Sequence, residues 1–130
     1  QTFCHGDLTM ENIIYDKKNK KYYLVDFLDN FIEHYWFDII NLFRDIEGKW
    51  YKFRNPEMNL NNTIPKMNFI NGFLRGNFLK DEKEYIKRHN LFLALNFARV
   101  LPYAKEEHKD YLINAINYNI EKHKNNLINT

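Results

Sequence analysis

The residues best suited to chemistry lie near the start of the sequence, in the run Cys4-His5-Gly6-Asp7-Leu8-Thr9-Met10-Glu11-Asn12 and in Val25-Asp26-Phe27. Asp7, Asn12 and Asp26 supply two carboxylates and one amide. A carboxylate can orient and deprotonate an attacking hydroxyl, and a carboxylate with an amide oxygen suits Mg²⁺, which prefers hard oxygen ligands. These residue types predict a site for phosphoryl transfer.

The spacing H-x-D-x-x-x-x-N, followed by an apolar strand that ends in Asp-Phe, is that of the catalytic and metal loops of kinases. His5-Gly6-Asp7, with Asn12 and Val25-Asp26-Phe27, resembles the aminoglycoside phosphotransferase and choline kinase superfamily, which reads H-G-D where protein kinases read H-R-D. A looser similarity, carried by residues 24–33, is to members associated with bacterial surface-polysaccharide synthesis. The alternative is a simple hairpin whose acidic residues only cap turns.

The resemblance implies a role for each motif residue. Asp7 would be the catalytic base that takes the proton of a substrate hydroxyl. Asn12 and Asp26 would hold one or two Mg²⁺ ions on the phosphates of ATP. His5 would support the catalytic loop from beneath. Asp38 would do the same, although a carboxylate in the first turn of a helix can also satisfy the free N–H groups of that helix.

Three further residues are implied as nucleotide contacts. Ile14 matches the apolar floor of the adenine pocket, and Val25 precedes the metal aspartate. Thr9 stands where protein kinases carry lysine, so only a hydroxyl donor is left near the γ-phosphate. Leu28 replaces the glycine of Asp-Phe-Gly, so no flipping activation segment is expected.

The chemistry needs a hairpin to position it. Two apolar runs, 12–15 and 22–25, flank the polar turn 16–21 and predict a β-hairpin. This hairpin would place Asn12 and Asp26 at the same end.

The remainder of the chain is expected to be helical. The apolar residues Ile39, Leu42, Phe43 and Ile46 form one stripe of a helix that begins near Tyr35. Further helices are predicted over residues 64–79, from a capping box at Asp81 and Glu84 to about Leu101, and over 106–125. The helix from Asp81 to about Leu101 is expected to be central and buried and to stop at Pro102. His89 on this helix is expected to be exposed.

Residues 48–63 are expected to form a long loop. Trp50, Tyr51 and Phe53 in this loop could form an aromatic wall for a sugar or a quaternary ammonium group. Trp36, which precedes the loop, is a further candidate substrate contact. Packing of the loop onto the core is the alternative for Trp50. Asp45 is interpreted as a solvated surface residue, as are Asp29 and Glu33.

Composition limits the function classes. The 130 residues carry a net charge of +2, which implies no field that would attract nucleic acid or a membrane. The single cysteine, Cys4, cannot form an internal disulfide, so a reducing cytoplasm is expected. No apolar run is long enough to span a bilayer.

We therefore expect residues 1–130 to form one α+β, mostly helical domain, which resembles the carboxyl-terminal lobe of a kinase-like enzyme with a small catalytic hairpin and about four helices. The expected cofactors are ATP and Mg²⁺. The expected acceptor is a small-molecule hydroxyl compound: a sugar or polyol first, choline or ethanolamine second, an aminoglycoside third. The resemblance also implies that the nucleotide lobe lies outside this sequence and that the uncovered fragment is inactive alone and could self-associate. The alternative is a catalytically silent binding module.

Overall fold

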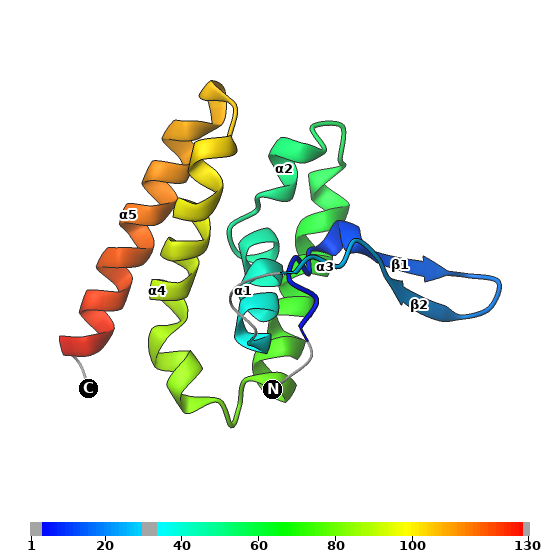
Figure 1. Ribbon diagram of the computed structural model, residues 1–130, viewed down its shortest axis with the longest axis horizontal. Helices are drawn as coiled ribbons and strands as arrows, with labels where there is room; N and C mark the ends of the chain where they lie inside the picture. Colours follow the sequence, from blue (N-terminus) through cyan, green and yellow to red (C-terminus); the bar gives the residue numbers. More distant parts are fainter. Residues whose placement is uncertain (1–3, 30–33, 129–130) are drawn as a thin grey trace.

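The computed structural model describes residues 4–29 and 34–128, and this part of the chain is α+β and mostly helical. A hairpin of β1 (Ile13–Asp16) and β2 (Lys21–Leu24) is followed by five α-helices in the described part (Figure 1). These are α1 (Tyr35–Ile46), α2 (Tyr51–Arg54), α3 (Leu60–Phe73), α4 (Lys83–Val100) and α5 (Glu106–Ile128). The stretch Phe31-Ile32-Glu33, part of the looser similarity, lies outside the described residues.

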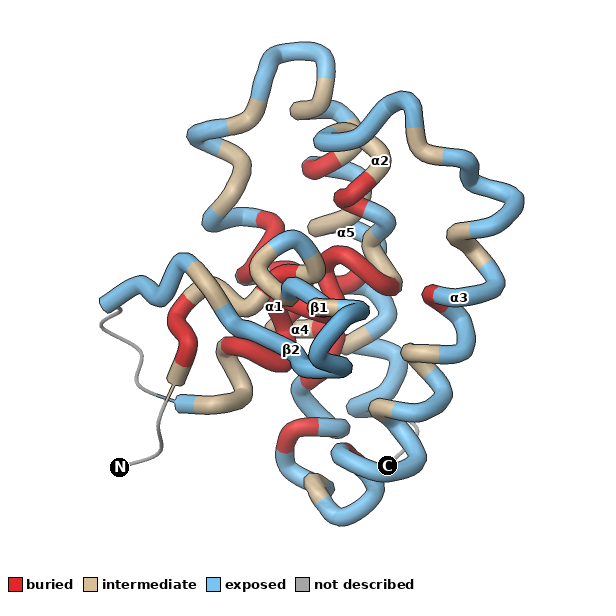
Figure 2. Tube along the Cα trace, turned by 90° about the vertical axis from the view of Figure 1, so that its right-hand side faces the viewer, coloured by how far each residue is buried: buried red, intermediate tan, exposed pale blue. Residues whose placement is uncertain are grey.

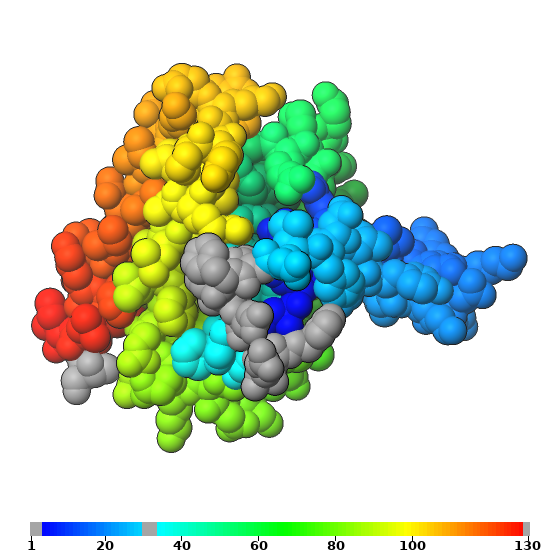
Figure 3. All heavy atoms as spheres, viewed as in Figure 1, coloured from blue at the N-terminus to red at the C-terminus, as the bar shows by residue number. Residues whose placement is uncertain are grey.

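The predicted hairpin is confirmed. Its strands are antiparallel, with Ile13 opposite Leu24 and Asp16 opposite Lys21. The Asp16 carboxylate accepts the backbone N–H groups of Lys18 and Asn19 at 2.9 and 3.1 Å, which closes the turn. The hairpin projects from the helical body (Figures 1 and 3), and neither strand has a buried residue.

The predicted helix after Tyr35 is confirmed as α1, and it is the centre of the molecule. The His34 ring caps its start by accepting the Trp36 N–H at 3.2 Å. Every residue from Asp38 to Ile46 is buried, including the whole predicted apolar stripe (Figure 2). Because α1 is covered all round, its polar side chains must find partners inside the protein.

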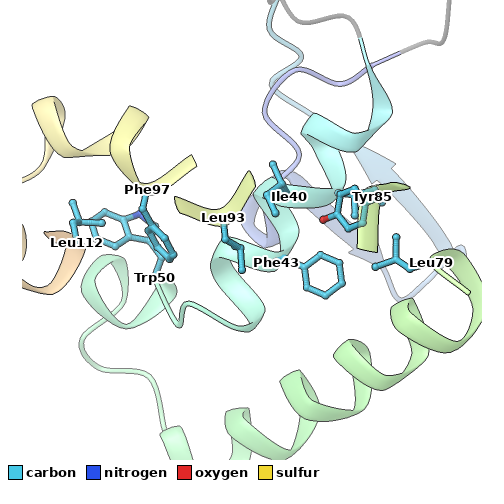
Figure 4. Packing of buried hydrophobic residues seen from close by; sticks show 9 residues of the cluster. Ile40, Phe43, Trp50, Leu79, Tyr85, Leu93, Phe97 and Leu112 are labelled. Carbon is cyan, nitrogen blue, oxygen red and sulfur yellow. The ribbon is translucent and has the colours of Figure 1, made fainter. Parts of the chain in front are cut away.

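The core forms where α1 and α4 pack together and α5 covers the far side of α4 (Figure 1). Aromatic and aliphatic side chains from these elements and their connections meet in one cluster (Figure 4), made of Ile39, Ile40, Phe43, Trp50, Leu79, Tyr85, Leu93, Phe97 and Leu112. A second cluster, Leu42, Ile46, Tyr51 and Met67, joins α1 to α2 and α3.

The prediction of a loop over residues 48–63 is wrong in part, because α2 interrupts this segment and α3 begins at Leu60. The closely spaced asparagines that suggested a loop include a helix cap. The Asn59 side chain accepts the Asn61 N–H at 3.1 Å. The helix predicted to start near Pro65 therefore starts one turn earlier, and it continues into a π-helical turn, η2 (Leu74–Phe78).

The prediction of α4 is correct in extent but wrong in three details. No capping box forms, because the cap residue is Glu82 and its carboxylate accepts hydrogen bonds from the Tyr35 hydroxyl and the Trp36 indole N–H instead. The helix is not buried on all sides, since Ile86 and Leu95 are 43% and 58% exposed. His89, which was expected at the surface, is buried.

The end of the chain follows the prediction. Pro102 lies in the short turn η3 (Leu101–Tyr103) that ends α4, and the last helix runs to Ile128 rather than to about Asn125. Leu112 is its fully buried inner residue. No helix in the described ranges is both long and apolar enough to cross a membrane.

Candidate active site

The loop that carries Asp7 is held from one side by the Asp38 carboxylate of α1. Its Oδ2 accepts the His5 N–H at 2.7 Å and its Oδ1 accepts the Gly6 N–H at 2.9 Å. Hydrogen bonds to a charged acceptor are about twice as strong as neutral ones. Asp38 therefore contacts the loop, as the resemblance implies, while His34 caps the helix.

A second carboxylate on the same face of α1 holds the other end of the loop. Asp45 lies two turns after Asp38, and its Oδ2 accepts the Met10 N–H at 3.1 Å. The prediction that Asp45 is a surface residue is wrong, because only 4% of it is exposed. Burial raises the pKa of the Asp45 carboxyl, although Arg44 and the Met10 amide partly oppose this shift.

The segment after β2 lies directly on this loop. The Val25 N–H donates to the Asn12 carbonyl at 3.1 Å, and the Leu28 N–H donates to the His5 carbonyl at 3.0 Å. The rings of His5 and Phe27 stack with centroids 4.3 Å apart. These contacts bring Asp26 to the same end of the hairpin as Asn12, beside the loop of Asp7.

Two backbone positions show how close this approach is. Gly6 has φ +84°, and a Cβ there would lie 1.9 Å from the Leu28 carbonyl oxygen. Only glycine fits such a position without displacing the neighbouring segment. Asp26 also has a positive φ, 58°, which is uncommon for a residue with a side chain and is frequent at functional sites.

Asn12 contacts the candidate residue Asp7 directly. The Asn12 side-chain NH₂ donates to the Asp7 carbonyl at 2.8 Å, which directs the Asn12 amide oxygen away from the loop. The Asp7 side chain is 30% exposed, and Asp26 is exposed. Within the described residues, no three His, Cys, Asp or Glu side chains gather into a metal site.

Sequence reasoning missed a residue that contacts Asp7 from α4. The Arg99 Nη2 atom lies 3.8 Å from Asp7 Oδ1 and 3.2 Å from the Asn41 Oδ1 that accepts its hydrogen bond. Asn41 also accepts a hydrogen bond from Asn96 at 2.8 Å, and Asn96 accepts one from Arg44 at 3.1 Å. This polar chain links the buried interface of α1 and α4 to Asp7. Its partners are too far apart in sequence to form a local pattern.

The predicted nucleotide contacts differ in accessibility. Ile14 is 49% exposed on the hairpin and Val25 is half-buried, so both present surface at the end where Asp26 lies. Thr9 is only 1% exposed, and its buried hydroxyl makes no hydrogen bond within the described part of the chain. The structure does not place this hydroxyl where a nucleotide could reach it, which corrects its assignment.

The two tryptophans predicted to contact substrate lie in different environments. Trp50 is buried in the main core, so it packs rather than forming a wall, which is the alternative left open by the sequence. Trp36 is partly buried and lines a pocket of about 400 Å³ between α1 and α4, which Arg99 also lines. The structure therefore places Trp36, but not Trp50, beside a cavity near Asp7.

Comparison with known proteins yields no relative: no family model, curated protein or solved structure matches the chain. The resemblance to the aminoglycoside phosphotransferase superfamily therefore rests on the motif residues themselves.

Proposed function

We propose that this chain is the catalytic lobe of an ATP-dependent phosphotransferase, which moves the γ-phosphate of ATP to a hydroxyl of a small molecule. The observation that carries the proposal is the hydrogen-bonded assembly of two segments over α1. The stretch from His5 to Asn12, which carries Asp7, and the segment of Asp26 are separate in sequence and contact each other directly. Such chemistry depends mainly on positioning and electrostatics, which this assembly supplies.

Asp7 is placed to act on the acceptor. Its partly exposed carboxylate would accept the hydroxyl proton as the acceptor oxygen bonds to the γ-phosphorus and the bond to ADP breaks. The Asp38 carboxylate fixes the backbone just before Asp7, and Arg99 borders its Oδ1. A fixed general base lowers the entropic part of the barrier.

Asn12 and Asp26 fit a site for Mg²⁺. They offer one amide oxygen and one carboxylate, and Mg²⁺ is commonly held by one or two protein oxygens together with substrate phosphates. Mg²⁺ bound there would offset charge on the phosphates. The residues' own part is to present hard oxygens at the end of the hairpin, where Asp26 is exposed.

The nucleotide would be covered by a further lobe of the same protein. The four glycines of this chain are dispersed, so they form no phosphate-binding loop. Ile14 and Leu24 are half-exposed on the hairpin, and Phe27 follows them with 49% exposure. We propose that this apolar surface packs against the nucleotide lobe, so that the chain alone is inactive.

The test is ATP turnover by the full-length natural protein with Mg²⁺ and a panel of hydroxyl compounds. Asp7→Asn keeps the shape of the side chain and removes the base, so we expect transfer to fall roughly 10²–10⁴-fold. Asp29→Asn, at an exposed position, is the matched control and should keep normal turnover. Near-normal turnover in a folded Asp7→Asn protein would refute the role of Asp7.

The exposed hairpin also favours a second candidate, a catalytically silent module that binds a protein partner. Tyr22, Phe27 and Leu28 are 72%, 49% and 56% exposed, and apolar surface of this kind is typical of interaction sites. Metal-dependent nucleotide binding separates the two functions, because the silent module requires none. Sedimentation of the chain at several concentrations tests self-association, and a monomer throughout would exclude a second copy as the partner.

A further inference from the structure

We propose that the pocket between α1 and α4 binds the acceptor, and that this acceptor is a 2-hydroxy acid with an aromatic or branched apolar side chain. The inference rests on the proposed function and names its substrate class. Three observations carry it: the apolar lining of the pocket, the Arg99 guanidinium in its wall, and the distance from that group to Asp7.

The pocket has a mostly apolar wall. Trp36, Phe37 and Ile40 line it from α1, and Phe92 and Leu95 line it from α4. Its volume of about 400 Å³ lies within the usual range for small-molecule sites. A hydroxyl buried there without a hydrogen-bond partner would weaken binding. A sugar or polyol has too many hydroxyls for this wall, whereas an aromatic or branched aliphatic group fits it.

The polar side chains of the wall favour an anion. They are His34, Asn96 and Arg99, and no carboxylate belongs to the described part of the lining. The Arg99 guanidinium carries five N–H donors and pairs with carboxylates. A quaternary ammonium or an aminoglycoside in the pocket would meet the Arg99 guanidinium, and no carboxylate of the described lining would offset that repulsion. The wall therefore disfavours both cationic acceptor classes.

The position of Arg99 fixes where the anionic group must be. Its guanidinium carbon lies 4.8 Å from the Phe37 ring centroid in the pocket, and its Nη2 lies 3.8 Å from Asp7 Oδ1. A hydroxyl at Asp7 and a carboxylate at Arg99 would therefore occupy adjacent places. Adjacent hydroxyl and carboxylate groups define a 2-hydroxy acid, and its apolar side chain would extend into the pocket.

The test is calorimetric binding of 3-phenyllactate to the 130-residue chain in the absence of nucleotide. We expect saturable binding, at least about tenfold weaker binding of 3-phenylpropane-1,2-diol, which lacks the carboxylate, and no binding of glucose or choline. Tighter binding of glucose or choline, or no binding of 3-phenyllactate at millimolar concentration, would overturn the inference.

Two variant pairs locate the ligand. Leu95→Trp places a bulky indole ring on the exposed rim of the pocket and should abolish binding of 3-phenyllactate. Ile86→Trp is the control, because Ile86 is exposed on the same helix but lies outside the pocket, and it should not change binding. Arg99→Gln should weaken 3-phenyllactate about tenfold, as expected for one lost charge-assisted contact, and leave the diol unchanged. Unaltered binding in a folded Leu95→Trp chain would overturn the inference. These binding measurements need no ATP, so their outcome is independent of the turnover test. The pocket proposal can fail while the phosphotransferase proposal succeeds, and the phosphotransferase proposal can fail while the pocket proposal succeeds.

Discussion

The centre of α1 and the hairpin differ in almost every physical respect. Every residue from Asp38 to Ile46 is buried, whereas no residue of β1 or β2 is. Helices α3 and α4 pack on α1, and the hairpin extends from the body with Tyr22 72% exposed (Figures 2 and 3). A two-stranded hairpin alone is marginally stable in water, so its base must be fixed by other contacts.

The difference shows how the site is built. The Asp7 loop lies at the border of the two regions and takes its rigidity from α1, through Asp38 and Asp45. The groups proposed to meet a metal and a nucleotide lie on the exposed side. The side of the loop that packs on α1 thus contributes stability, and the opposite side is open to ligands. Substitutions on the buried side should therefore lower the free energy of unfolding more than substitutions on the exposed side.

The largest loss of stability is expected from Asp38→Ala. It removes two hydrogen bonds to a buried carboxylate and leaves the His5 and Gly6 N–H groups without an acceptor, so the free energy of unfolding should fall by about 3–5 kcal/mol. Urea denaturation measures the change. Asp29→Ala is the exposed control and should stay within about 0.5 kcal/mol of the parent. Equal effects of the two substitutions would contradict the anchoring role.

Gly6→Ala should cost about 3 kcal/mol, because the new Cβ meets the Leu28 carbonyl in a left-handed backbone conformation. Gly72→Ala provides the contrast. No atom lies within 4 Å of a Cβ at that helical position, so alanine should stabilise the chain by up to about 1 kcal/mol. The same thermal or urea titration compares both, and a tolerated Gly6→Ala would show that the loop does not lie on the Asp26 segment.

The end of α1 should give the buried region a pH dependence. Burial alone would raise the pKa of Glu47, but the hydrogen bond and charge of His89, at 2.9 Å, and those of Arg75 outweigh it and lower the pKa from 4.5 to about 2. A depressed carboxyl pKa stabilises the fold above the unfolded value. This contribution, on the order of 2–3 kcal/mol, should be present above pH 4.5 and lost as the pH falls towards 2.

Urea titrations between pH 6 and pH 2 test this dependence in the parent and in Glu47→Gln. The difference in stability between the two chains should shrink as the pH falls through this window. A difference that does not change with pH would contradict the assignment.

The smallest effect is expected at the hairpin tip. Tyr22 is largely exposed and packs against Tyr15 with ring centroids 4.8 Å apart, so Tyr22→Ser should cost less than about 1 kcal/mol. Chemical denaturation checks this value. A loss several times larger would show that the hairpin is integrated into the core, and the contrast between the two regions would fail.

The sequence predicted the features that depend on local patterns. Two apolar runs around a polar turn predict the hairpin, and the stripe through Phe43 predicts α1. The contact of Asp38 with the loop was implied by the family resemblance. The prediction of a loop over residues 48–63 was wrong in part because asparagine is common both in turns and at helix caps. Asn59 serves as a helix cap.

The missed residues are polar groups with distant partners. Asp45 bonds to Met10, His89 to Glu47, and Arg99 lies beside Asp7. Nothing local marks these residues as buried or as part of the site, because a charged side chain near a helix end is usually solvated. Their roles depend on the way α1 and α4 pack, which only the fold reveals.

The most direct test of the proposed phosphotransferase site is paramagnetic broadening of NMR signals by Mn²⁺, in place of Mg²⁺, with ATP present. We predict that the signals of Asn12, Asp26 and the Asp7 loop broaden first, that Asp26→Asn abolishes this selectivity, and that Asp29→Asn preserves it. Broadening that is absent at Asn12 and Asp26, or that is the same in Asp26→Asn, would contradict a metal–nucleotide site at the base of the hairpin.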